Sequence, residues 1–333
     1  MSDDMNNLRA VGIIGTGKYV PEKILTNSDL EKMVDTNDEW IVSRTGIKQR
    51  HIAAPDQATS DLAYEAAIKA LESAGMTGSD LDLIIVATIT PDSSFPSTAC
   101  ILQDKLGAKG AAAFDLSAAC SGFVYGLASA TSFIQSGMYN NALVIGADCL
   151  SRITDYTDRN TCVLFGDGAG AVVVGEVPEG RGFKAFDLGA EGAGGSLLQM
   201  EGGGSRLPAT TETVENKKHY INMNGREVFK FAVRVMGTAT IEVLRKAGME
   251  RTDVDLFVPH QANIRIIQSA MQRLELPEEK VVVNVDKYAN TSAASIPLAL
   301  VEAAEEGRMK AGDTVLMVGF GGGLTWGASV LVW

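Results

Sequence analysis

Cysteine is scarce in this sequence, which has four in 333 residues and no CxxC pair. A disulfide framework or a cysteine-rich zinc site needs more cysteines at closer spacing, so both classes are excluded. The N-terminal stretch MSDDMNNLRA is acidic and polar, unlike a signal or transit peptide. We therefore expect a protein of a reducing compartment, the cytoplasm.

Basic residues are also few, with 29 Lys and Arg against 41 Asp and Glu, a formal net charge of −12. Such a chain is a poor general binder of nucleic acid or of anionic membranes. Residues 116–147 carry no charge, but their apolar part, 123–134, ends at Gln135 and is shorter than the ~20 residues of a membrane span. This stretch predicts a buried helix followed by a buried strand, with no membrane segment.

Short apolar runs alternate with helical patterns along the chain, and 46% hydrophobic residues exclude disorder. Strands are predicted at 11–15, 83–88, 112–116, 142–147, 256–258, 281–285 and 314–319. Helices are predicted at 36–46, opened by a Thr36–Glu39 capping box, at 63–74, 97–106, from 121 onward, and at 225–247, 263–274 and 295–307. Continuous apolar strands separated by helices favour an α/β fold with parallel sheets covered on both faces.

The two halves of the chain end alike, each with a buried strand, a glycine-rich turn and a further apolar strand. The first such ending contains GDGAGAVVVGE and the second FGGGLTWGASVLVW. This weak internal symmetry predicts two similar halves, residues 1–180 and 181–333. The turn-rich segment 189–219 is predicted to be the long crossover between them.

Only three histidines are available as a general base, and two of them, His51 and His219, lie in polar runs typical of a surface. His260 instead ends a predicted strand and precedes a helix. In open α/β sheets ligands gather beyond the carboxyl ends of strands, which makes His260 a candidate site residue. A histidine that simply packs at a strand end is the competing interpretation.

Cys120 and Asn290 occupy similar strand-to-helix junctions. Cys120 lies between the strand ending at 116 and the helix beginning near 121, where the helix N-terminus would stabilise a thiolate. Asn290 follows the predicted strand 281–285 and precedes a helix. The competing interpretations are a buried structural cysteine and a helix-capping asparagine.

Taken together, a cysteine, a histidine and an asparagine at such junctions can converge on one pocket. Two reaction classes use this set. In a Cys-His-Asn hydrolase, Asn orients His and His activates Cys. In a carbon–carbon bond-forming acyltransferase, Cys holds an acyl group while His and Asn donate hydrogen bonds to a thioester oxygen. A non-catalytic scaffold is the third possibility at this point.

Five motifs resemble the β-ketoacyl-acyl carrier protein synthase III family of the thiolase superfamily: DLSAACSGF around Cys120, VPHQANIRI around His260, NTSAASIPLAL from Asn290, LFGDGAGA and GFGGGLTWG. The resemblance implies a five-layered αβαβα fold built from two duplicated halves. It also implies the initiating condensation of type II fatty acid synthesis, between a short acyl-CoA and malonyl-acyl carrier protein. A related enzyme of secondary metabolism, with another acyl donor, stays open.

The resemblance assigns roles residue by residue. Cys120 matches the nucleophile, His260 and Asn290 the malonyl-thioester pair, and the backbone N–H groups of Cys120 and Gly322 the oxyanion hole. Further matches are Trp40, Arg44, Arg159 and Asn263 for CoA, Phe320 and Phe95 for the acyl and malonyl pocket, and Gln261 and Arg265 for carrier-protein docking.

Three cations, Arg226, Lys230 and Arg234, recur at i, i+4 and i+8 on the predicted helix 225–247 and form a candidate docking stripe. The family is homodimeric, with Phe95 reaching into the partner, and needs no metal or organic cofactor. Two positions depart from the family pattern. Ala289 stands where relatives have glycine, and Leu324 stands where an aromatic is common, so a backbone angle or pocket wall is expected to differ.

Overall fold

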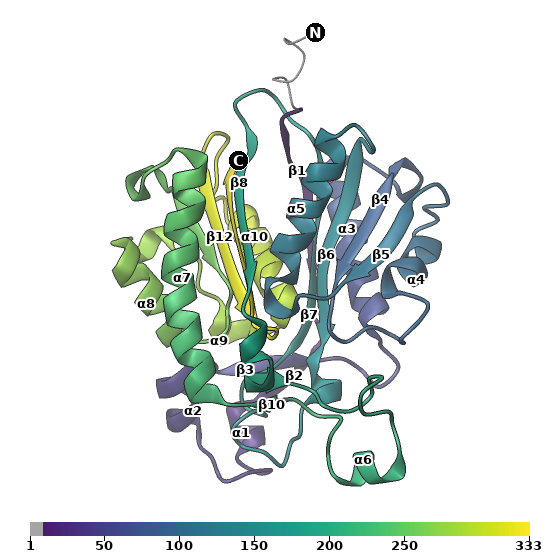
Figure 1. Cartoon of the computed structure of the whole chain (residues 1–333), viewed down its shortest axis with the longest axis vertical. Coiled ribbons are helices and arrows are strands. Elements are labelled where there is room, and N and C mark those ends of the chain that lie inside the picture. The colour runs from purple at the N-terminus through teal and green to yellow at the C-terminus, as the bar shows by residue number, and fades with distance from the viewer. Residues whose placement is uncertain (1–8) are drawn as a thin grey trace.

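The structure of the chain is a computed structural model that describes residues 9–333. Two sheets form its framework (Figure 1). The first has the strand order β1-β7-β6-β4-β5, with bounds Val11–Tyr19, Asp167–Glu176, Asn141–Cys149, Leu83–Ala87 and Ala112–Leu116. The second has the order β11-β12-β13-β8, with bounds Leu256–Pro259, Thr314–Gly321, Thr325–Val332 and Gly182–Ala190.

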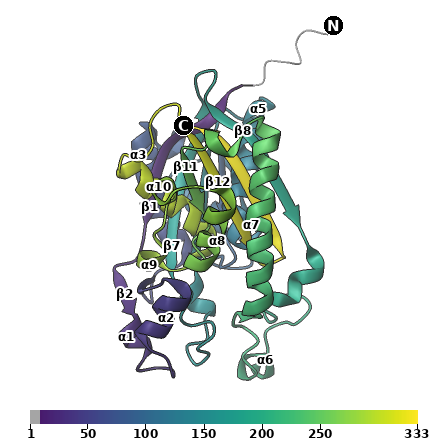
Figure 2. The ribbon, with the colours of Figure 1, turned by 90° about the vertical axis from the view of Figure 1, so that its left-hand side faces the viewer.

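Helices and sheets stack in five layers (Figures 1 and 2). The outer face of the first sheet is covered by α3 (Thr59–Ala74) and α4 (Thr98–Lys105). Between the sheets lie α5 (Gly122–Gln135) and α10 (Ser295–Glu305), and the outer face of the second sheet is covered by α7 (Gly225–Ala247) and α8 (Ile264–Leu274). The expected αβαβα order is therefore present.

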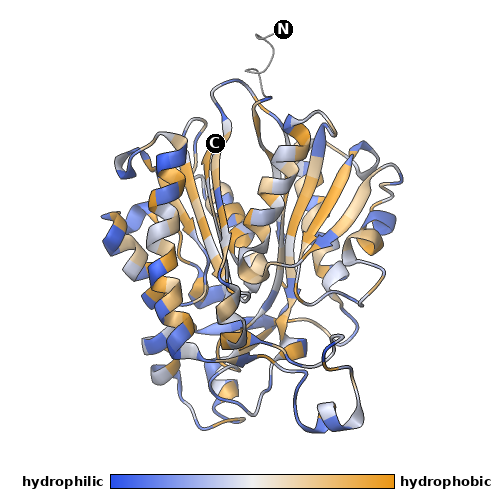
Figure 3. Cartoon of the chain, viewed as in Figure 1, coloured by the Kyte–Doolittle hydropathy of each residue, from blue (hydrophilic) through white to orange (hydrophobic). Residues whose placement is uncertain are grey.

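Apolar side chains fill the spaces between these layers. The strands and the helices beside them are largely coloured as hydrophobic in Figure 3. In β4, Ile84 and Val86 point into the core under α3, whereas Leu83 and Ile85 point into the core between the sheets. Because both faces of the strand are buried, β4 reads as a continuous apolar run rather than an alternating one.

The predicted alanine stripe of α3 packs directly on β1. A Cβ at Gly15 or Gly17 of β1 would lie 2.4 Å from the Ala70 carbonyl oxygen or 2.3 Å from that of Ala66. Small residues on both elements thus permit this close approach. The helix ends at Gly75 in the left-handed conformation, as predicted.

The strands are not all parallel, so that prediction was wrong for part of each sheet. β7 runs antiparallel to both of its neighbours, and β13 runs antiparallel to β12 and β8. Of these pairs, only β12 and β13 are joined by a tight turn, which requires an antiparallel pair, whereas a longer segment joins β6 to β7. Read outward from β8, the second sheet repeats the order and strand directions of the first.

The predicted strand 281–285 is also wrong. Its first residue makes only an isolated parallel bridge, Val281 to Phe257, and Val285 already begins α9 (Val285–Tyr288). The side-chain amide of Gln261 donates to the Val282 carbonyl at 3.0 Å and accepts from the Asn284 N–H at 2.9 Å. The Gln261 side chain thereby satisfies backbone hydrogen-bonding groups at the position that corresponds to β5 of the first sheet.

The crossover prediction is corrected as well. β7 ends at Glu176 and β8 begins at Gly182, so only a short turn separates the two sheets along the chain. Residues 191–224 instead make an excursion between β8 and α7, with β9 (Leu198–Gln199), α6 (Thr211–Glu215) and β10 (Asn222–Met223). The division at residues 180 and 181 stays a prediction.

A smaller region lies below the two sheets in Figures 1 and 2. It holds β2 (Lys23–Thr26), α1 (Asn27–Leu30), α2 (Asp38–Thr45), β3 (Gln49–Ile52) and α6. Helix α2 is capped by Asn37, whose side chain accepts from the Trp40 N–H, rather than by the predicted Thr36. Across residues 9–333, none of the helices has the length and apolar character that a bilayer crossing requires.

A fully buried arginine ties this region together. The Arg50 guanidinium donates to the carbonyls of Leu25 and Val163 and to the Asn27 side chain. All three acceptors are neutral. Burial lowers the pKa of Arg50 to about 10, which still leaves it charged at neutral pH.

Candidate active site

Cys120 lies in a short 3-10 helix, η3 (Ala119–Ser121), that leads directly into α5. The residue is only 7% exposed. The end of β12 packs against it, because a Cβ at Gly321 would lie 2.5 Å from the Cys120 nitrogen. Glycine is therefore required where the second half of the chain meets the cysteine, and the predicted strand-to-helix position of Cys120 is confirmed.

The ionisation of this thiol differs from the prediction. Burial raises the pKa of Cys120 to about 12, the adjacent Ser292 hydroxyl works against that rise, and the Asp148 carboxylate adds to it. Loss of solvent is the dominant influence on the pKa of this thiol. In the ligand-free chain Cys120 is a neutral thiol at neutral pH.

An apolar pocket of about 330 Å³ opens at Cys120. Ser292 and Gly322 line it beside the cysteine. Its remaining wall is mostly hydrophobic and includes Ile89, Leu150, Ile153, Phe165, Leu198 and Ile221. The pocket can therefore hold a hydrocarbon group attached to the cysteine sulfur.

Asn290 is held by backbone bonds to the LFGDGAGA motif of the first half. Its N–H donates to the Leu164 carbonyl and its carbonyl accepts from the Gly166 N–H, both at 3.0 Å. Its side-chain Oδ1 accepts from the Ser292 N–H at 2.9 Å. The amide oxygen is thus engaged, which leaves the Nδ2 hydrogens as the groups that Asn290 can offer to a ligand.

His260 follows β11 and is 1% exposed. Its Nδ1 lies 2.5 Å from Ser295 Oγ, and its ring packs edge-on against Phe320 with centroids 5.2 Å apart. Burial lowers the pKa of His260 to about 3, so the ring is neutral at neutral pH. The other two histidines have structural partners: His51 Nδ1 lies 2.6 Å from the Pro21 carbonyl, and His219 Nε2 lies 2.9 Å from Thr213 Oγ1.

One segment, residues 290–295, connects the three predicted catalytic residues. It begins with Asn290, places Ser292 near Cys120, and places Ser295 against His260. It is itself anchored on the buried Asp148 carboxylate, which accepts from the Ala293 N–H at 3.3 Å and from the Thr88 hydroxyl at 2.9 Å. Ser292, Ser295 and Asp148 were missed from the sequence, because serine in a turn and aspartate at a strand end are common for local reasons.

Backbone strain gathers around these residues. Three non-glycine residues have positive φ next to the site: Ala119 at 46°, Ser292 at 51° and Ala289 at 59°. Ala289 has ψ −158°, a region that side-chain-bearing residues rarely occupy. This is the position where relatives were expected to have glycine, so the departure places a strained alanine directly before Asn290. The other departure, Leu324, is 1% exposed and packs against Gly194.

The four residues predicted for CoA lie together at the edge of the lower region. The guanidinium carbons of Arg44 and Arg159 lie 4.6 Å and 5.0 Å from the centroid of the Trp40 ring. Asn263, the N-cap of α8, donates its side-chain amide to the Arg44 carbonyl at 3.0 Å. Arg159 also contacts Asp35, with 2.9 Å to its carbonyl and 3.3 Å to its carboxylate.

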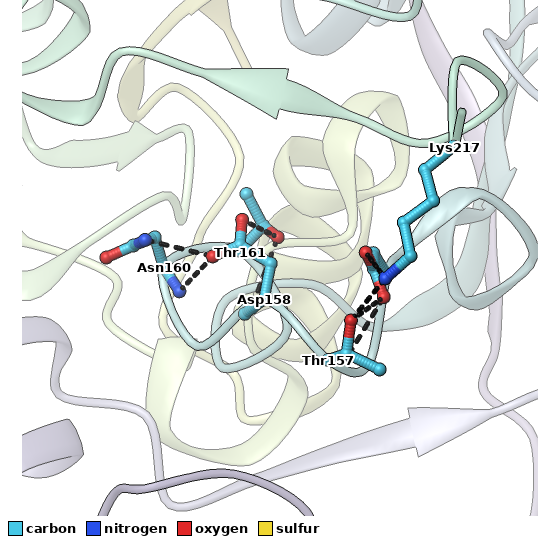
Figure 4. Close-up of polar contacts among 6 residues, drawn as sticks. Thr157, Asp158, Asn160, Thr161 and Lys217 are labelled. Carbon is cyan, nitrogen blue, oxygen red and sulfur yellow. Dashed lines mark hydrogen bonds and ion pairs between the residues drawn. The ribbon is translucent and has the colours of Figure 1, made fainter.

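The loop that carries Arg159 is shaped by its own side chains (Figure 4). The Asp158 carboxylate accepts from the Thr161 hydroxyl at 2.9 Å and from the Asn160 N–H at 3.0 Å. On the other side of Arg159, Lys217 reaches over from the segment after α6 and bonds the Thr157 hydroxyl at 2.6 Å. These contacts hold the loop on both sides of the arginine.

The residues predicted to dock a carrier protein do not share one environment. Arg265 and the stripe Arg226, Lys230 and Arg234 are exposed, but Lys230 pairs with Glu227 and Arg234 with Glu191, both at 2.7 Å. Gln261 is 0% exposed and bonded on every polar side-chain atom, so its assignment to a docking surface is wrong. The amide is needed inside the protein instead.

Phe95 and Phe320 also differ from each other. Phe320 is 4% exposed, whereas Phe95 is 87% exposed at the tip of the loop before α4. Within residues 9–333, His, Cys, Asp and Glu side chains form no group of three or more that could hold a metal ion.

Comparison with known proteins agrees with this arrangement. Residues 114–192 match the family model for 3-oxoacyl-[acyl-carrier-protein (ACP)] synthase III, and residues 244–333 match the model for its C-terminal part. A beta-ketoacyl-[acyl-carrier-protein] synthase III from Desulfitobacterium hafniense (strain DSM 10664 / DCB-2) is 62% identical over 97% of this chain and 98% of its own length.

Solved structures match as well. The 3-oxoacyl-[acyl-carrier-protein] synthase III from Aquifex aeolicus VF5 is 53% identical, with a TM-score of 0.90, over 97% of this chain and 100% of the other. The priming beta-ketosynthase from the R1128 polyketide biosynthetic pathway is 35% identical, with a TM-score of 0.91, over 100% of this chain and 99% of the other.

The five layers, with Cys120 at the start of a helix that lies between the two sheets, define an enzyme of the thiolase fold. Its class is that of the condensing acyltransferases. Within that class, the chain belongs to the 3-oxoacyl-[acyl-carrier-protein] synthase III family, which initiates fatty acid synthesis.

Proposed function

We propose that this enzyme transfers a short acyl group from acyl-CoA to Cys120 and then condenses it with malonyl-acyl carrier protein. The observation that carries this proposal is the segment 290–295, which joins Asn290, Cys120 and His260 beside an apolar pocket. Covalent catalysis on the cysteine, assisted by positioned donors, requires no metal or organic cofactor.

In the first half-reaction the Cys120 sulfur attacks the acyl-CoA carbonyl, and CoA leaves as the thiol. The acyl chain occupies the pocket of about 330 Å³. The developing oxyanion is held by the N–H groups of Cys120 and Gly322, two residues that line the same pocket. Removing one such donor typically costs roughly 10²- to 10³-fold in rate.

In the second half-reaction the malonyl thioester loses CO2, and the electron pair of the broken bond forms an enolate. Its oxygen accepts hydrogen bonds from Asn290 Nδ2 and from His260. The nascent carbanion then attacks the carbonyl of the Cys120 thioester, and the C–S bond breaks. The β-ketoacyl product is released, and the departing Cys120 thiolate takes up a proton from solvent. Donors that act where charge develops in the transition state contribute roughly 3 kcal/mol each.

The site geometry favours condensation over a Cys-His-Asn hydrolase. In a hydrolase His takes the thiol proton. Asn must also orient His, yet His260 Nδ1 is engaged by Ser295 and Asn290 Oδ1 by Ser292. These contacts leave a side-chain nitrogen of His260 and of Asn290 as a possible donor, which supports condensation.

CoA is proposed to bind along Trp40, Arg44, Arg159 and Asn263, with the adenine stacked between Trp40 and Arg159. In the ligand-free chain Arg159 itself lies over the Trp40 ring at 5.0 Å, too close for a base between them. Nucleotide entry therefore requires the Arg159 side chain to swing outward, away from the Trp40 ring.

The carrier protein is acidic in this family, and this chain has a net charge of −12, so docking needs a local basic surface. We assign that surface to Arg265 and Arg226, which are exposed and have no ion-pair partner among the described residues. Lys230 and Arg234 contribute less because each already has an acidic neighbour.

The active form is proposed to be a homodimer in which Phe95, largely exposed on one protomer, closes the acyl pocket of its partner. The cytoplasm is its proposed location. All four cysteines are free thiols, a state that a reducing compartment maintains.

The first test offers acetyl-, isobutyryl- and octanoyl-CoA in turn with malonyl-acyl carrier protein and follows CO2 and product by mass spectrometry. The matched variant is Cys120→Ser, which keeps the size of the side chain. Product from one donor that disappears in the variant supports the proposal and defines the chain-length class. Acylation of Cys120 followed only by hydrolysis of the acyl-enzyme would overturn the proposal. Condensation only with an acyl donor other than these three would favour a role in polyketide synthesis.

A further inference from the structure

A single hydroxyl contacts the buried ring of His260. Ser295, the first residue of α10, places its Oγ 2.5 Å from His260 Nδ1, and both residues are 1% exposed. The same oxygen lies 3.4 Å from the Gln261 backbone nitrogen, which donates to it. Among the described residues Ser295 Oγ has no other hydrogen-bond partner.

Counting protons decides which group donates in this contact. A serine hydroxyl has one proton and two lone pairs, and a backbone N–H can only donate. If His260 carried its proton on Nδ1, both neighbours would donate to Ser295 Oγ, and the hydroxyl proton would have no acceptor. A buried donor without an acceptor is costly, because it has lost its hydrogen bonds to water.

The alternative satisfies every group. The Gln261 N–H donates to Ser295 Oγ, the Ser295 hydroxyl donates to His260 Nδ1, and the single proton of the neutral ring resides on Nε2. The ring is neutral because burial lowers the pKa of His260 to about 3. Only the tautomer remains to be set, and a neutral imidazole can donate from one nitrogen alone.

We propose that Ser295 is a positioning residue that holds His260 in its Nε2–H tautomer, the form that can donate to the enolate oxygen during condensation. This inference rests on the proposed function. The opposite tautomer would turn a lone pair toward a developing negative charge. The proton stays on Nε2 throughout this step. The electron pair of the C–C bond that breaks as CO2 leaves remains on the enolate, whose oxygen is stabilised by hydrogen bonds and is not protonated.

Residues 290–295 would then orient both donors by the same logic. The Ser292 N–H occupies the oxygen of the Asn290 amide, so that its nitrogen faces outward. Three residues later, the Ser295 hydroxyl occupies Nδ1 of His260, so that Nε2–H faces outward. The segment that leads into α10, a helix without a side-chain cap, thus orients two hydrogen-bond donors, Asn290 Nδ2 and His260 Nε2.

The direct test is nuclear magnetic resonance of protein labelled with 15N-histidine. The chain has only three histidines, so two-bond 15N–1H correlations can show which nitrogen of His260 bears the proton. We expect Nε2–H in the wild type and in Ser329→Ala, and a shift toward Nδ1–H in Ser295→Ala. Ser329 is a matched control because its hydroxyl is also buried but has no hydrogen-bond partner.

Kinetics separate positioning from a merely structural role. In Ser295→Ala, kcat for CO2 release from malonyl-acyl carrier protein should fall about tenfold or more, within the roughly 10²- to 10³-fold that loss of a whole donor costs. The KM for the carrier substrate and the rate of Cys120 acylation should stay near wild type. Ser295→Thr, which keeps the hydroxyl, should restore most of the rate.

The outcomes also distinguish this inference from the proposed function. If the wild type forms no condensation product, the proposed function fails, and the catalytic role of Ser295 fails with it. If the wild type condenses but its His260 carries the proton on Nδ1, only the Ser295 inference is overturned. The same holds if Ser295→Ala retains the wild-type kcat.

Discussion

Replacing Ala289 with glycine tests whether the backbone before Asn290 is strained. Ala289 has φ 59° and ψ −158°, and a conformation so rarely adopted by side-chain-bearing residues costs about 1–3 kcal/mol. Glycine removes that cost. It also removes a fully buried methyl group, worth about 0.8 kcal/mol, and loosens the unfolded chain by about 0.5–1 kcal/mol.

These terms nearly cancel, so a second variant is needed to isolate the strain. Ala294 is equally buried but has ordinary helical angles, φ −75° and ψ −17°. Ala294→Gly therefore loses the methyl group and the chain entropy without any relief. It should lower the free energy of unfolding by about 1.3–1.8 kcal/mol. Ala289→Gly should be more stable than Ala294→Gly by about 1–3 kcal/mol.

The assay is urea unfolding of wild type and both variants at one protein concentration, since association shifts apparent stability. The slope of unfolding free energy against urea must be the same for all three proteins, so that the midpoints report stability alone. If Ala289→Gly loses as much stability as Ala294→Gly, residue 289 carries no strain and the reasoning fails.

Four further outcomes follow from other parts of the structure. Burial lowers the pKa of His260 from 6.5 to about 3, so the unfolded state binds a proton that the native state excludes, and stability should be lost as the pH falls from about 6.5 toward 3. In His260→Gln the urea midpoint should fall less over this pH range. Equal pH dependence of wild type and variant would contradict the burial argument. Arg265→Glu should raise the KM for malonyl-acyl carrier protein and leave the rate of Cys120 acylation unchanged. The control Lys109→Glu makes the same charge change elsewhere on the surface and should alter neither quantity. An unchanged KM for the carrier substrate in Arg265→Glu would refute the docking role. Arg50→Met should lower the free energy of unfolding by about 3 kcal/mol or more because three buried acceptors lose their donor; a loss under 1 kcal/mol in urea melts would show that they find other partners. Sedimentation should give a dimer for the wild type and a weaker one for Phe95→Ala, and an active wild-type monomer would exclude the proposed interface.

The positions of the catalytic candidates could be predicted because they depend on local sequence. Cys120 and His260 each lie where an apolar strand meets a helix, and that pattern is visible in a single chain. The spacing of apolar residues likewise predicted α3, α5, α7 and α10. Such features follow from backbone period and from burial, which nearby residues determine.

Other features depend on contacts between distant segments, and these escaped prediction. The valines at 281–283 have the composition of a strand, but the amide of Gln261 bonds the backbone there and diverts the chain toward α9. The same contact buries Gln261 and removes it from the surface that the resemblance assigned to it. One glutamine thus accounts for two errors, because its partners lie 21 and 23 residues away.

The charge state of the resting site was also beyond the sequence, and it bears on how the reaction begins. Burial raises the pKa of the Cys120 thiol and lowers the pKa of the His260 imidazole, so both shifts oppose moving a proton from Cys120 to His260 in the empty site. Burial therefore disfavours a standing thiolate–imidazolium pair, the pair that a cysteine hydrolase uses. Both groups rest neutral, and in the proposed reaction charge arises only as the reaction proceeds, on oxygens that accept hydrogen bonds from backbone and side-chain donors. An enzyme that must decarboxylate one thioester beside another benefits from this, because without a resting base few groups are left to activate water.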